Sequence, residues 1–283
     1  MLITTDAELR QFIPNVFTTC DGEVPLLTKL TPFLALSEDW LTTHFLGSAQ
    51  LASIVAVSAS PLRSTCCNII VADALRSALP SLDLVLTPNG FGIVSNGNLA
   101  PASAERVNRL ATSLINHRDN LLQSLLTQLS LIAAWRDSEQ GRFFAATLWQ
   151  DLSLATACGI TSEQWQHFME LRNQLVLIED ELAERFVSHE LFSTFRQHVQ
   201  SHAIAESEQP IIAILRSVET RLLVSKCWEN PAAWRSVSEQ LRSLVQRIRS
   251  NPTAFPQWQS STTAQRYNLP QFQNQKHSKG YWW

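Results

Sequence analysis

Charged residues are scarce in this sequence. Only 17% of its 283 residues are Asp, Glu, Lys or Arg, whereas ordinary soluble domains carry about 25%. The formal net charge is −3, and no block of Lys and Arg residues occurs anywhere. Domains that bind nucleic acid usually have such a basic patch, so sequence-specific DNA binding is not expected.

Long apolar runs are also missing. No run approaches the about 18 residues that would suggest a membrane span. The first residues, MLITTDAELRQFIP, contain acids where a signal peptide needs a basic segment followed by an apolar one. We therefore expect a soluble protein that is made in the cytoplasm and has no membrane partner.

The cysteines follow no metal-binding pattern. They are odd in number, and their spacing matches no zinc motif; they are Cys20, Cys66, Cys67, Cys158 and Cys227. Adjacent cysteines such as Cys66 and Cys67 seldom form a disulfide with each other. We expect reduced, mostly buried thiols.

Catalytic signatures are absent as well. The sequence has no HExxH, GxSxG or Walker lysine, and its short glycine motifs at 90–92 and 96–98 are better explained as turns. His198 and His202 would share one helical face, with two glutamates following, so a zinc enzyme is one alternative. A solvated polar face is the simpler interpretation, and we predict no catalytic residue, no cofactor and no metal.

Two acidic pairs, Glu38–Asp39 and Glu179–Asp180, occur in similar surroundings. Neighbouring positions on a helix point about 100° apart, so neither pair can act as an acid/base dyad on one substrate. We interpret them as structural, for example by binding an Arg between helices.

Helical periodicity dominates what the sequence does contain. Apolar residues recur every three or four positions from Leu26 to Phe45, and Thr5 with Glu8 forms a capping box. The same reasoning predicts further helices near 5–13, 61–79, 101–137, 142–157, 161–187, 189–203, 209–226 and 231–249.

The two halves of the sequence resemble each other. Residues 30–54 align without a gap on 171–195, with seven identities in 25 positions. Two later matches keep the same order: LRS at 75–77 with 215–217, and 101–115 with 231–245. Amphipathic helices also resemble one another by chance. We nevertheless predict a mainly α protein with a tandemly duplicated helical bundle, its halves at 1–140 and 141–249.

A strand-turn-strand pattern interrupts the first half. Leucines alternate along 82–86, and Pro88-Asn89-Gly90 supplies a turn before Phe91. We predict a β-hairpin insertion at 82–95. An isolated hairpin has unpaired edges, so Asn89, Gly90 and Phe91 are candidate partner-binding residues.

The last segment, 250–283, is rich in Pro, Gln and Asn and has no apolar period. It nevertheless holds seven aromatic residues, a side-chain type that dominates contact energy at interfaces. We predict an extended arm that binds a partner through Phe255, Trp258, Tyr267, Phe272, Tyr281, Trp282 and Trp283. The alternatives are a disordered end or a strap over its own domain.

Several stretches carry a family resemblance. LDLVLTPNGFGIVSNGNLAPASAERVNRL, ITTDAELRQFIPNV with LTPFLALSEDWLTTHF, and NPTAFPQW resemble an uncharacterised family of proteins encoded by Bacteroidetes phages and prophages. The resemblance implies a structural role in the virion near the head–tail junction.

An ELRQFI helix followed by a SEDWLTTHF helix is similar to phage head–tail connector (adaptor) proteins. These are small helical bundles that form a ring beneath the portal, often with a C-terminal arm inserted into the portal or a neighbour. This chain is about twice as long, which leaves its ring size and ring position open.

We therefore expect a non-enzymatic connector in the neck of the virion. The implied partners are the portal protein, neighbouring copies of the chain and other neck or tail proteins, while DNA passes through without sequence-specific binding. The alternative is a prophage assembly factor or regulatory binding module that is absent from the finished virion.

Overall fold

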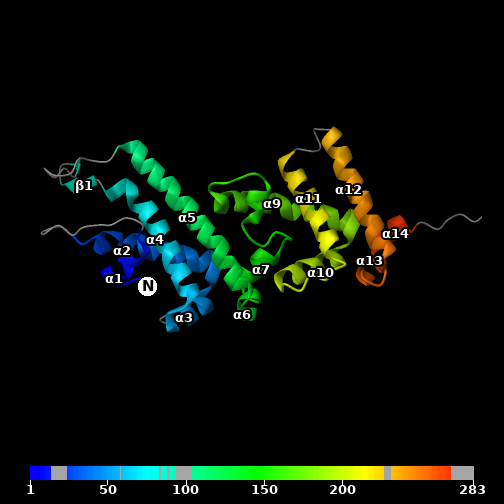
Figure 1. Cartoon of the computed structure of the whole chain (residues 1–283), viewed down its shortest axis with the longest axis horizontal. Coiled ribbons are helices and arrows are strands. Elements are labelled where there is room, and N and C mark those ends of the chain that lie inside the picture. The colour runs from blue at the N-terminus through cyan, green and yellow to red at the C-terminus, as the bar shows by residue number, and fades with distance from the viewer. Residues whose placement is uncertain are drawn as a thin grey trace, which may run out of the picture. The chain divides into compact units, whose positions relative to one another are not determined.

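The computed structural model describes residues 1–13, 24–57, 59–82, 84–87, 90–93, 103–225 and 231–268, and this part of the chain is mainly helical (Figure 1). It divides into two compact units. Unit 1 comprises Met1–Gln174 and Val199–Ala203, and unit 2 comprises Leu175–His198 and Ile204–Trp283. The first unit extends beyond the predicted boundary at 140 because Phe144 packs against Phe45, with ring centroids 5.7 Å apart.

Unit 1 is built from helices joined mostly by short connections. Its elements are α1 (Asp6–Phe12), α2 (Leu26–Leu41), the π-helical turn η1 (Thr42–Leu46), α3 (Ser48–Ala56), α4 (Pro61–Leu82), α5 (Ala104–Ser130), α6 (Ala133–Arg136), α7 (Glu139–Ala145), α8 (Ser153–Ala157) and the first half of α9 (Gln164–Leu182). The long helix α4 packs against both α2 and α5 (Figure 1). The predicted stripe on α2 is confirmed, since Leu30, Leu34 and Leu41 are buried. The capping box at Thr5 and Glu8 is also confirmed.

Two of the helices predicted from the sequence are each divided into shorter helices in the structure. The helix predicted at 101–137 is broken, because Ile132 is extended between α5 and α6. The one predicted at 142–157 is two helices, α7 and α8. The Ser138 hydroxyl accepts a hydrogen bond from the Gly141 N–H and so starts α7 as a separate helix.

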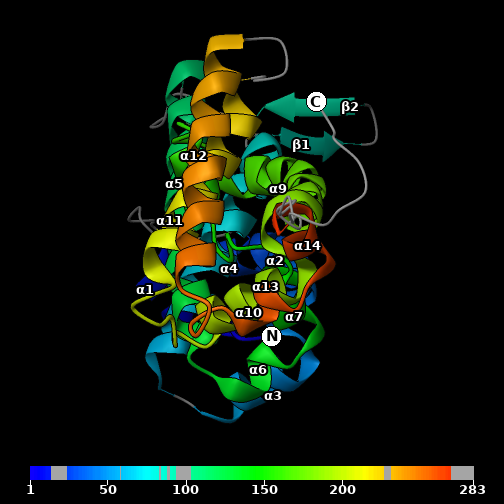
Figure 2. The ribbon, with the colours of Figure 1, turned by 90° about the vertical axis from the view of Figure 1, so that its right-hand side faces the viewer.

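Two short strands lie in the connection between α4 and α5. The strands β1 (Leu84–Thr87) and β2 (Gly90–Ile93) pair antiparallel, with Leu84 opposite Ile93 and Thr87 opposite Gly90 (Figure 2). Both strands fall within the range 82–95, where the sequence pattern indicated strands.

Unit 2 consists of the second half of α9 and the elements that follow it. These are the π-helical turn η2 (Ala183–Val187), α10 (His189–Gln200), α11 (Gln209–Val224), α12 (Pro231–Ser250), α13 (Pro256–Gln259) and α14 (Thr262–Tyr267). The helices α11 and α12 pack against each other (Figure 2). Its core includes Phe192, Phe195, Leu215, Leu244 and Trp258.

One unusual backbone turn occurs in both units. Helix α2 ends in η1, Gly47 follows with φ 74° and ψ 160°, and α3 begins. Helix α9 ends in η2, Ser188 follows with φ 81° and ψ 148°, and α10 begins. The N–H of each positive-φ residue donates to the carbonyl that opens the π-turn, Thr42 O or Ala183 O, at 2.8 Å in both cases. These positions coincide in the alignment of 30–54 with 171–195.

No single helix among the described residues is both long and apolar enough to cross a membrane. The bent pair α3 and α4 meets the criteria of length and composition only when its two helices are taken together.

Candidate interaction surfaces

Each π-turn is closed by a tryptophan from much later in the same unit. In unit 1 the indole N–H of Trp135 donates to the Phe45 carbonyl at 2.6 Å. In unit 2 the indole N–H of Trp258 donates to the Phe186 carbonyl at 2.9 Å. Carbonyls at a helix end need such partners when they are buried.

The residues after each tryptophan also correspond. The hydroxyls of Ser138 and Ser261 each donate to the carbonyl of the tryptophan three residues earlier, both at 2.6 Å, and each serine caps the next helix. From that helix, Gln140 donates to the Thr43 carbonyl in unit 1. Thr263 donates to the Glu184 carbonyl in unit 2.

In unit 1 the outer side of the π-turn is covered by Trp165, from the first turn of α9. Its ring lies 6.2 Å from Trp40, 5.8 Å from His44 and 4.6 Å from Phe45, measured between ring centroids. The backbone N–H of Trp165 donates to Asp119 Oδ2 at 3.3 Å. An aromatic side chain and a charge-assisted hydrogen bond therefore fix this cover together.

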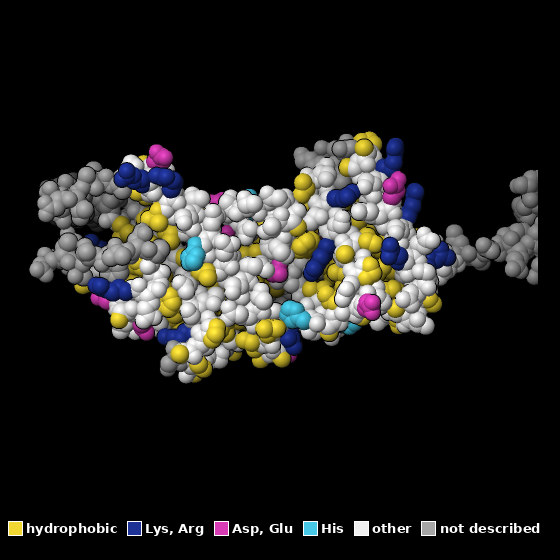
Figure 3. Space-filling model, viewed as in Figure 1, with side chains coloured by type: hydrophobic (Ala, Val, Ile, Leu, Met, Phe, Trp, Pro, Cys, Tyr) yellow, Lys and Arg dark blue, Asp and Glu magenta, His cyan; other side chains and the backbone are white. Residues whose placement is uncertain are grey.

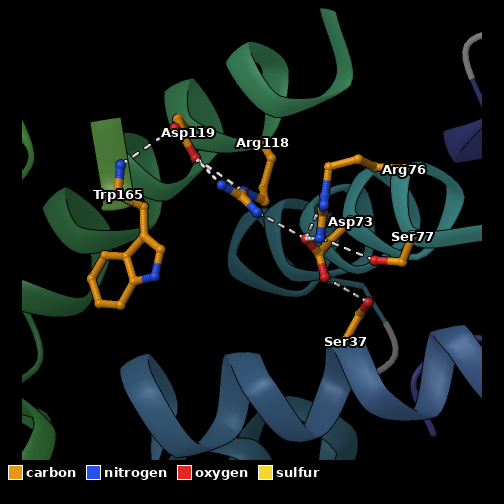
Figure 4. Close-up of polar contacts among 7 residues, drawn as sticks. All are labelled: Ser37, Asp73, Arg76, Ser77, Arg118, Asp119 and Trp165. Carbon is orange, nitrogen blue, oxygen red and sulfur yellow. Dashed lines mark hydrogen bonds and ion pairs between the residues drawn. The ribbon is translucent and has the colours of Figure 1, made fainter. Parts of the chain in front are cut away.

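Asp119 belongs to a buried polar network (Figure 4). Arg118 lies between two carboxylates, donating to Asp119 Oδ1 and Asp73 Oδ1, both at 2.9 Å. Asp73 also accepts from Ser37 Oγ at 2.8 Å and from Arg76. The network joins α2, α4, α5 and the start of α9. Because two guanidinium groups balance two carboxylates, neither carboxylate is placed as a general base.

Unit 2 has an open apolar groove where its own π-turn meets α11 and α12. Its volume is about 380 Å³, and it is lined by Leu177, Ile178, Glu181, Leu182, Arg185, Phe186, Leu222, Trp234 and Leu241. Leu177 is 71% exposed and Trp234 is 46% exposed. Exposed apolar side chains gathered in a hollow are typical of a binding surface.

Charge contributes little to these surfaces. On the face shown in Figure 3, a few Lys and Arg side chains lie side by side at the upper left, and the other charged side chains are scattered among uncharged ones. This agrees with the 17% of charged residues in the sequence.

The prediction of an extended arm is wrong for residues 250–268. Pro256 opens α13 and Ser261 caps α14, so the chain folds back onto η2. Phe255 and Trp258 are buried, and the Tyr267 hydroxyl donates to the Arg185 carbonyl at 2.9 Å. Phe255 and Trp258 are therefore core residues of unit 2, and the half-buried Tyr267 packs on the same unit. The other predicted arm residues, Phe272, Tyr281, Trp282 and Trp283, lie outside the described residues.

The predicted contact residues of the hairpin are only partly described. Gly90 and Phe91 lie in β2, opposite Thr87 and Leu86. Asn89 lies outside the described residues.

The two histidines considered as zinc ligands have other partners. His198 Nδ1 lies 2.8 Å from a carboxylate oxygen of the buried Glu208. His202 Nε2 lies 2.9 Å from the Ser130 hydroxyl. Within the described ranges, no group of three His, Cys, Asp or Glu residues is placed to hold a metal ion.

The described cysteines, Cys66, Cys67 and Cys158, are free thiols. Burial raises the pKa of Cys66 to about 12 and that of Cys67 to about 11. Both thiols are therefore protonated, and hence weak nucleophiles, at neutral pH. Cys20 and Cys227 lie outside the described residues.

The two acidic pairs have different roles. Glu179 is fully buried and accepts from Arg196 Nε at 2.8 Å, so it binds an Arg between α9 and α10 as predicted. Glu38 instead accepts from the Leu2 N–H at 2.6 Å and lies 3.3 Å from the amino group of Met1.

Comparison with known proteins gives one match. Residues 24–145 match a family of unknown function (DUF6712). No curated protein and no solved structure matches the chain. The matched range begins just before α2 and ends with the last residue of α7. It therefore covers the π-turn η1 together with α6 and α7, whose residues close that turn.

The groove and the closing tryptophans were not predicted from the sequence. A signal for the tryptophans was present, because Trp135 and Trp258 are each followed three residues later by a serine. The groove had no such signal, since α9 and η2 form one side of it and α11 and α12, about 40 or more positions later, form the other.

Proposed function

We propose that the protein is a non-enzymatic structural component of a phage virion, a head–tail connector whose copies form a ring at the portal–tail junction. Two things support the proposal. The sequence resembles the phage family and the connector proteins, and the described chain consists of mainly helical units of the kind that this resemblance implies.

We further propose that the chain carries two copies of one helical unit. The run from α2 to α7 and the run from α9 to α14 share a π-turn, a positive-φ residue after it and a late tryptophan that closes it. The family match covers the first run alone. Two linked copies account for a chain about twice as long as the connectors it resembles.

The hairpin is the proposed contact between neighbouring copies. The segment 83–103 joins α4 to α5, whereas the short segment 225–230 joins the corresponding helices α11 and α12. Because α11 and α12 pack together without a hairpin, the hairpin is not needed for packing such a pair. This difference is the observation that carries the proposal.

A hairpin is suited to that contact. Within the described residues β1 pairs only with β2, so both outer edges can accept a further strand. Pairing with an edge strand is a common route by which protein chains associate. Residues 250–268, which were predicted as part of the arm but fold onto unit 2, play no role in this proposed contact.

The test replaces residues 83–102 with residues 225–230 of the same chain, Ser-Lys-Cys-Trp-Glu-Asn. Ser103, which precedes α5, is kept. We expect the helical circular-dichroism signal to stay unchanged, while rings seen by negative-stain electron microscopy disappear and sedimentation gives single chains.

Two further variants make the test decisive. A Gly-Ser segment of the original length in place of 83–102 removes the strands without shortening the connection, in case the short version strains α4 and α5. A Gly-Ser replacement of 226–230 is the matched control and should leave assembly intact. Rings that persist in both hairpin variants would refute the hairpin contact.

The place of the protein in the virion needs a separate measurement. Mass spectrometry of purified virions should find the protein at the stoichiometry of a ring. Its absence from virions that contain portal and tail proteins would instead favour an assembly factor or regulatory module.

A further inference from the structure

The groove of unit 2 has a counterpart in unit 1 that is already filled. In the alignment of 30–54 with 171–195, three lining residues, Glu181, Arg185 and Phe186, correspond to Trp40, His44 and Phe45. Those three residues of unit 1 are the ones that the ring of Trp165 contacts. An aromatic side chain therefore covers this site in one unit, while the described residues leave it open in the other.

The covering residue of unit 1 comes from the chain that follows its closing helices. Phe144 lies in α7, and Trp165 follows in the next helix but one. In unit 2 the residue at the place of Phe144 is Tyr267 in α14, which contacts the closing tryptophan Trp258 just as Phe144 contacts Trp135. The chain beyond Tyr267 is therefore the segment in the corresponding position.

That segment has suitable residues, and the chain that precedes it contacts a residue of the groove. Tyr267 donates its hydroxyl to the carbonyl of Arg185, a groove residue, at 2.9 Å. Residues 269–283, LPQFQNQKHSKGYWW, include four aromatic side chains. At about 3.3 Å per extended residue, even a few residues reach across the groove. A short tether also gives its own segment an effective concentration in the millimolar range.

We propose that residues 269–283 lie in the groove of their own unit 2, where an aromatic side chain of this segment takes the place that Trp165 takes in unit 1. The segment thus completes unit 2 and is not an arm for a neighbour. The inference is independent of the proposed role in the virion.

The test compares hydrogen exchange in the full chain and in a chain that ends at Asn268. The truncated chain should expose the groove, so the amides of 175–186 and 231–241 should exchange about tenfold faster or more, as expected when a large aromatic side chain no longer covers them. A synthetic peptide of residues 269–283 should restore protection in a saturable way. The same peptide with its four aromatic residues changed to Ser should not.

Two variants at equivalent positions separate groove binding from general damage. Leu177→Glu places a charge in the groove and should abolish protection by the segment. Leu36→Glu is the matched control, since Leu36 occupies the equivalent position in unit 1 and is 68% exposed. It should leave the protection of unit 2 unchanged.

Dilution identifies the source of the segment. Binding within one chain predicts the same protection at about 0.5 and about 50 μM, because a tethered segment does not depend on protein concentration. Protection that disappears on dilution would assign the groove to a neighbouring copy, and equal exchange in the full and truncated chains would mean that the segment does not bind there. Either result overturns the inference. Neither bears on the hairpin contact, which is tested through ring formation.

Discussion

Units 1 and 2 build the same turn from different residues. After the π-turn, unit 1 places Gly47 at φ 74° and unit 2 places Ser188 at φ 81°. Glycine adopts such a conformation at no steric cost, whereas a serine there is strained by about 1–3 kcal/mol. The hydrogen bonds that hold both turns are nevertheless the same. The comparison shows that backbone bonding defines this turn, and that the side chain at the positive-φ position is secondary.

The units differ more in their buried charges. Unit 1 neutralises Asp73 and Asp119 with two arginines in a network that several helices share. In unit 2 the fully buried Glu179 is bound by Arg196. Its counterpart in unit 1, Glu38, is partly exposed and accepts from the Leu2 N–H.

The largest expected effect on stability at neutral pH comes from removing Arg196. Arg196→Met should lower the free energy of unfolding of unit 2 by about 3–5 kcal/mol, because it removes a cation that lies 2.7 Å from a carboxylate with no exposed surface. The comparison variant is Glu38→Gln at the position equivalent to Glu179, which should cost only about 1 kcal/mol because the amide oxygen still accepts from Leu2. Urea unfolding followed by circular dichroism measures both. Equal losses would contradict the difference between the units.

The next effect concerns the closing tryptophans. Trp135→Phe and Trp258→Phe each leave a carbonyl of the π-turn without its indole donor, at an expected cost of about 1–3 kcal/mol. Hydrogen exchange should place each loss in its own unit. A loss for only one of the two tryptophans would show that the turns are not equivalent.

Exchanging the residues of the two turns should give effects of opposite sign. Gly47→Ser should cost about 1–3 kcal/mol, and the new Cβ would also lie 2.7 Å from Gln140 Oε1. Ser188→Gly should stabilise unit 2 by about 1 kcal/mol, because it relieves the strain at positive φ. Thermal unfolding of both variants measures the difference, and destabilisation by Ser188→Gly would mean that its contact with Leu191 outweighs the strain.

An effect that is absent at neutral pH is a fall in the stability of unit 1 at alkaline pH. Burial raises the pKa of Cys66 to about 12 and that of Cys67 to about 11, from an ordinary value of 9.0. The unfolded thiols therefore ionise first, so the stability that these groups contribute is complete below pH 9 and is lost as the pH rises towards the folded values. Unfolding midpoints at pH 8, 9.5 and 10.5 should fall less steeply in the Cys66→Ala, Cys67→Ala double variant. Identical slopes would show that these thiols do not set the alkaline limit.

The long helices were predictable because several turns share one apolar period. The stripe from Leu30 to Phe45 and the capping box at Thr5 could be identified directly from the sequence. The four-residue helix α13 could not, because it is too short to show a period, and the prolines and glutamines of 250–283 suggested an extended arm. The burial of Trp258 depends on a carbonyl 72 positions earlier, which no local pattern reveals.

The match between 101–115 and 231–245 illustrates a second limit. It aligned the Pro-Ala starts of the two segments, yet the buried residues agree in another register. Leu122, Leu125, Leu126 and Leu129 of α5 have the same spacing as Leu241, Leu244, Val245 and Ile248 of α12. The helices have 27 and 20 residues, and their starts are more exposed than their later turns. Burial constrains those later turns, whereas the starts are free to vary.

The late position of each closing tryptophan has a consequence for biosynthesis. The contact of Trp135 with the Phe45 carbonyl spans 90 positions, and that of Trp258 with the Phe186 carbonyl spans 72. A ribosome that has released the chain as far as Trp135 has supplied the residue that closes the turn of unit 1, while most of unit 2 is still to be translated. The turn of unit 2 cannot be closed until Trp258 has left the ribosome. Until then the Phe186 carbonyl lacks its indole donor, and chaperones can bind the incompletely folded helices.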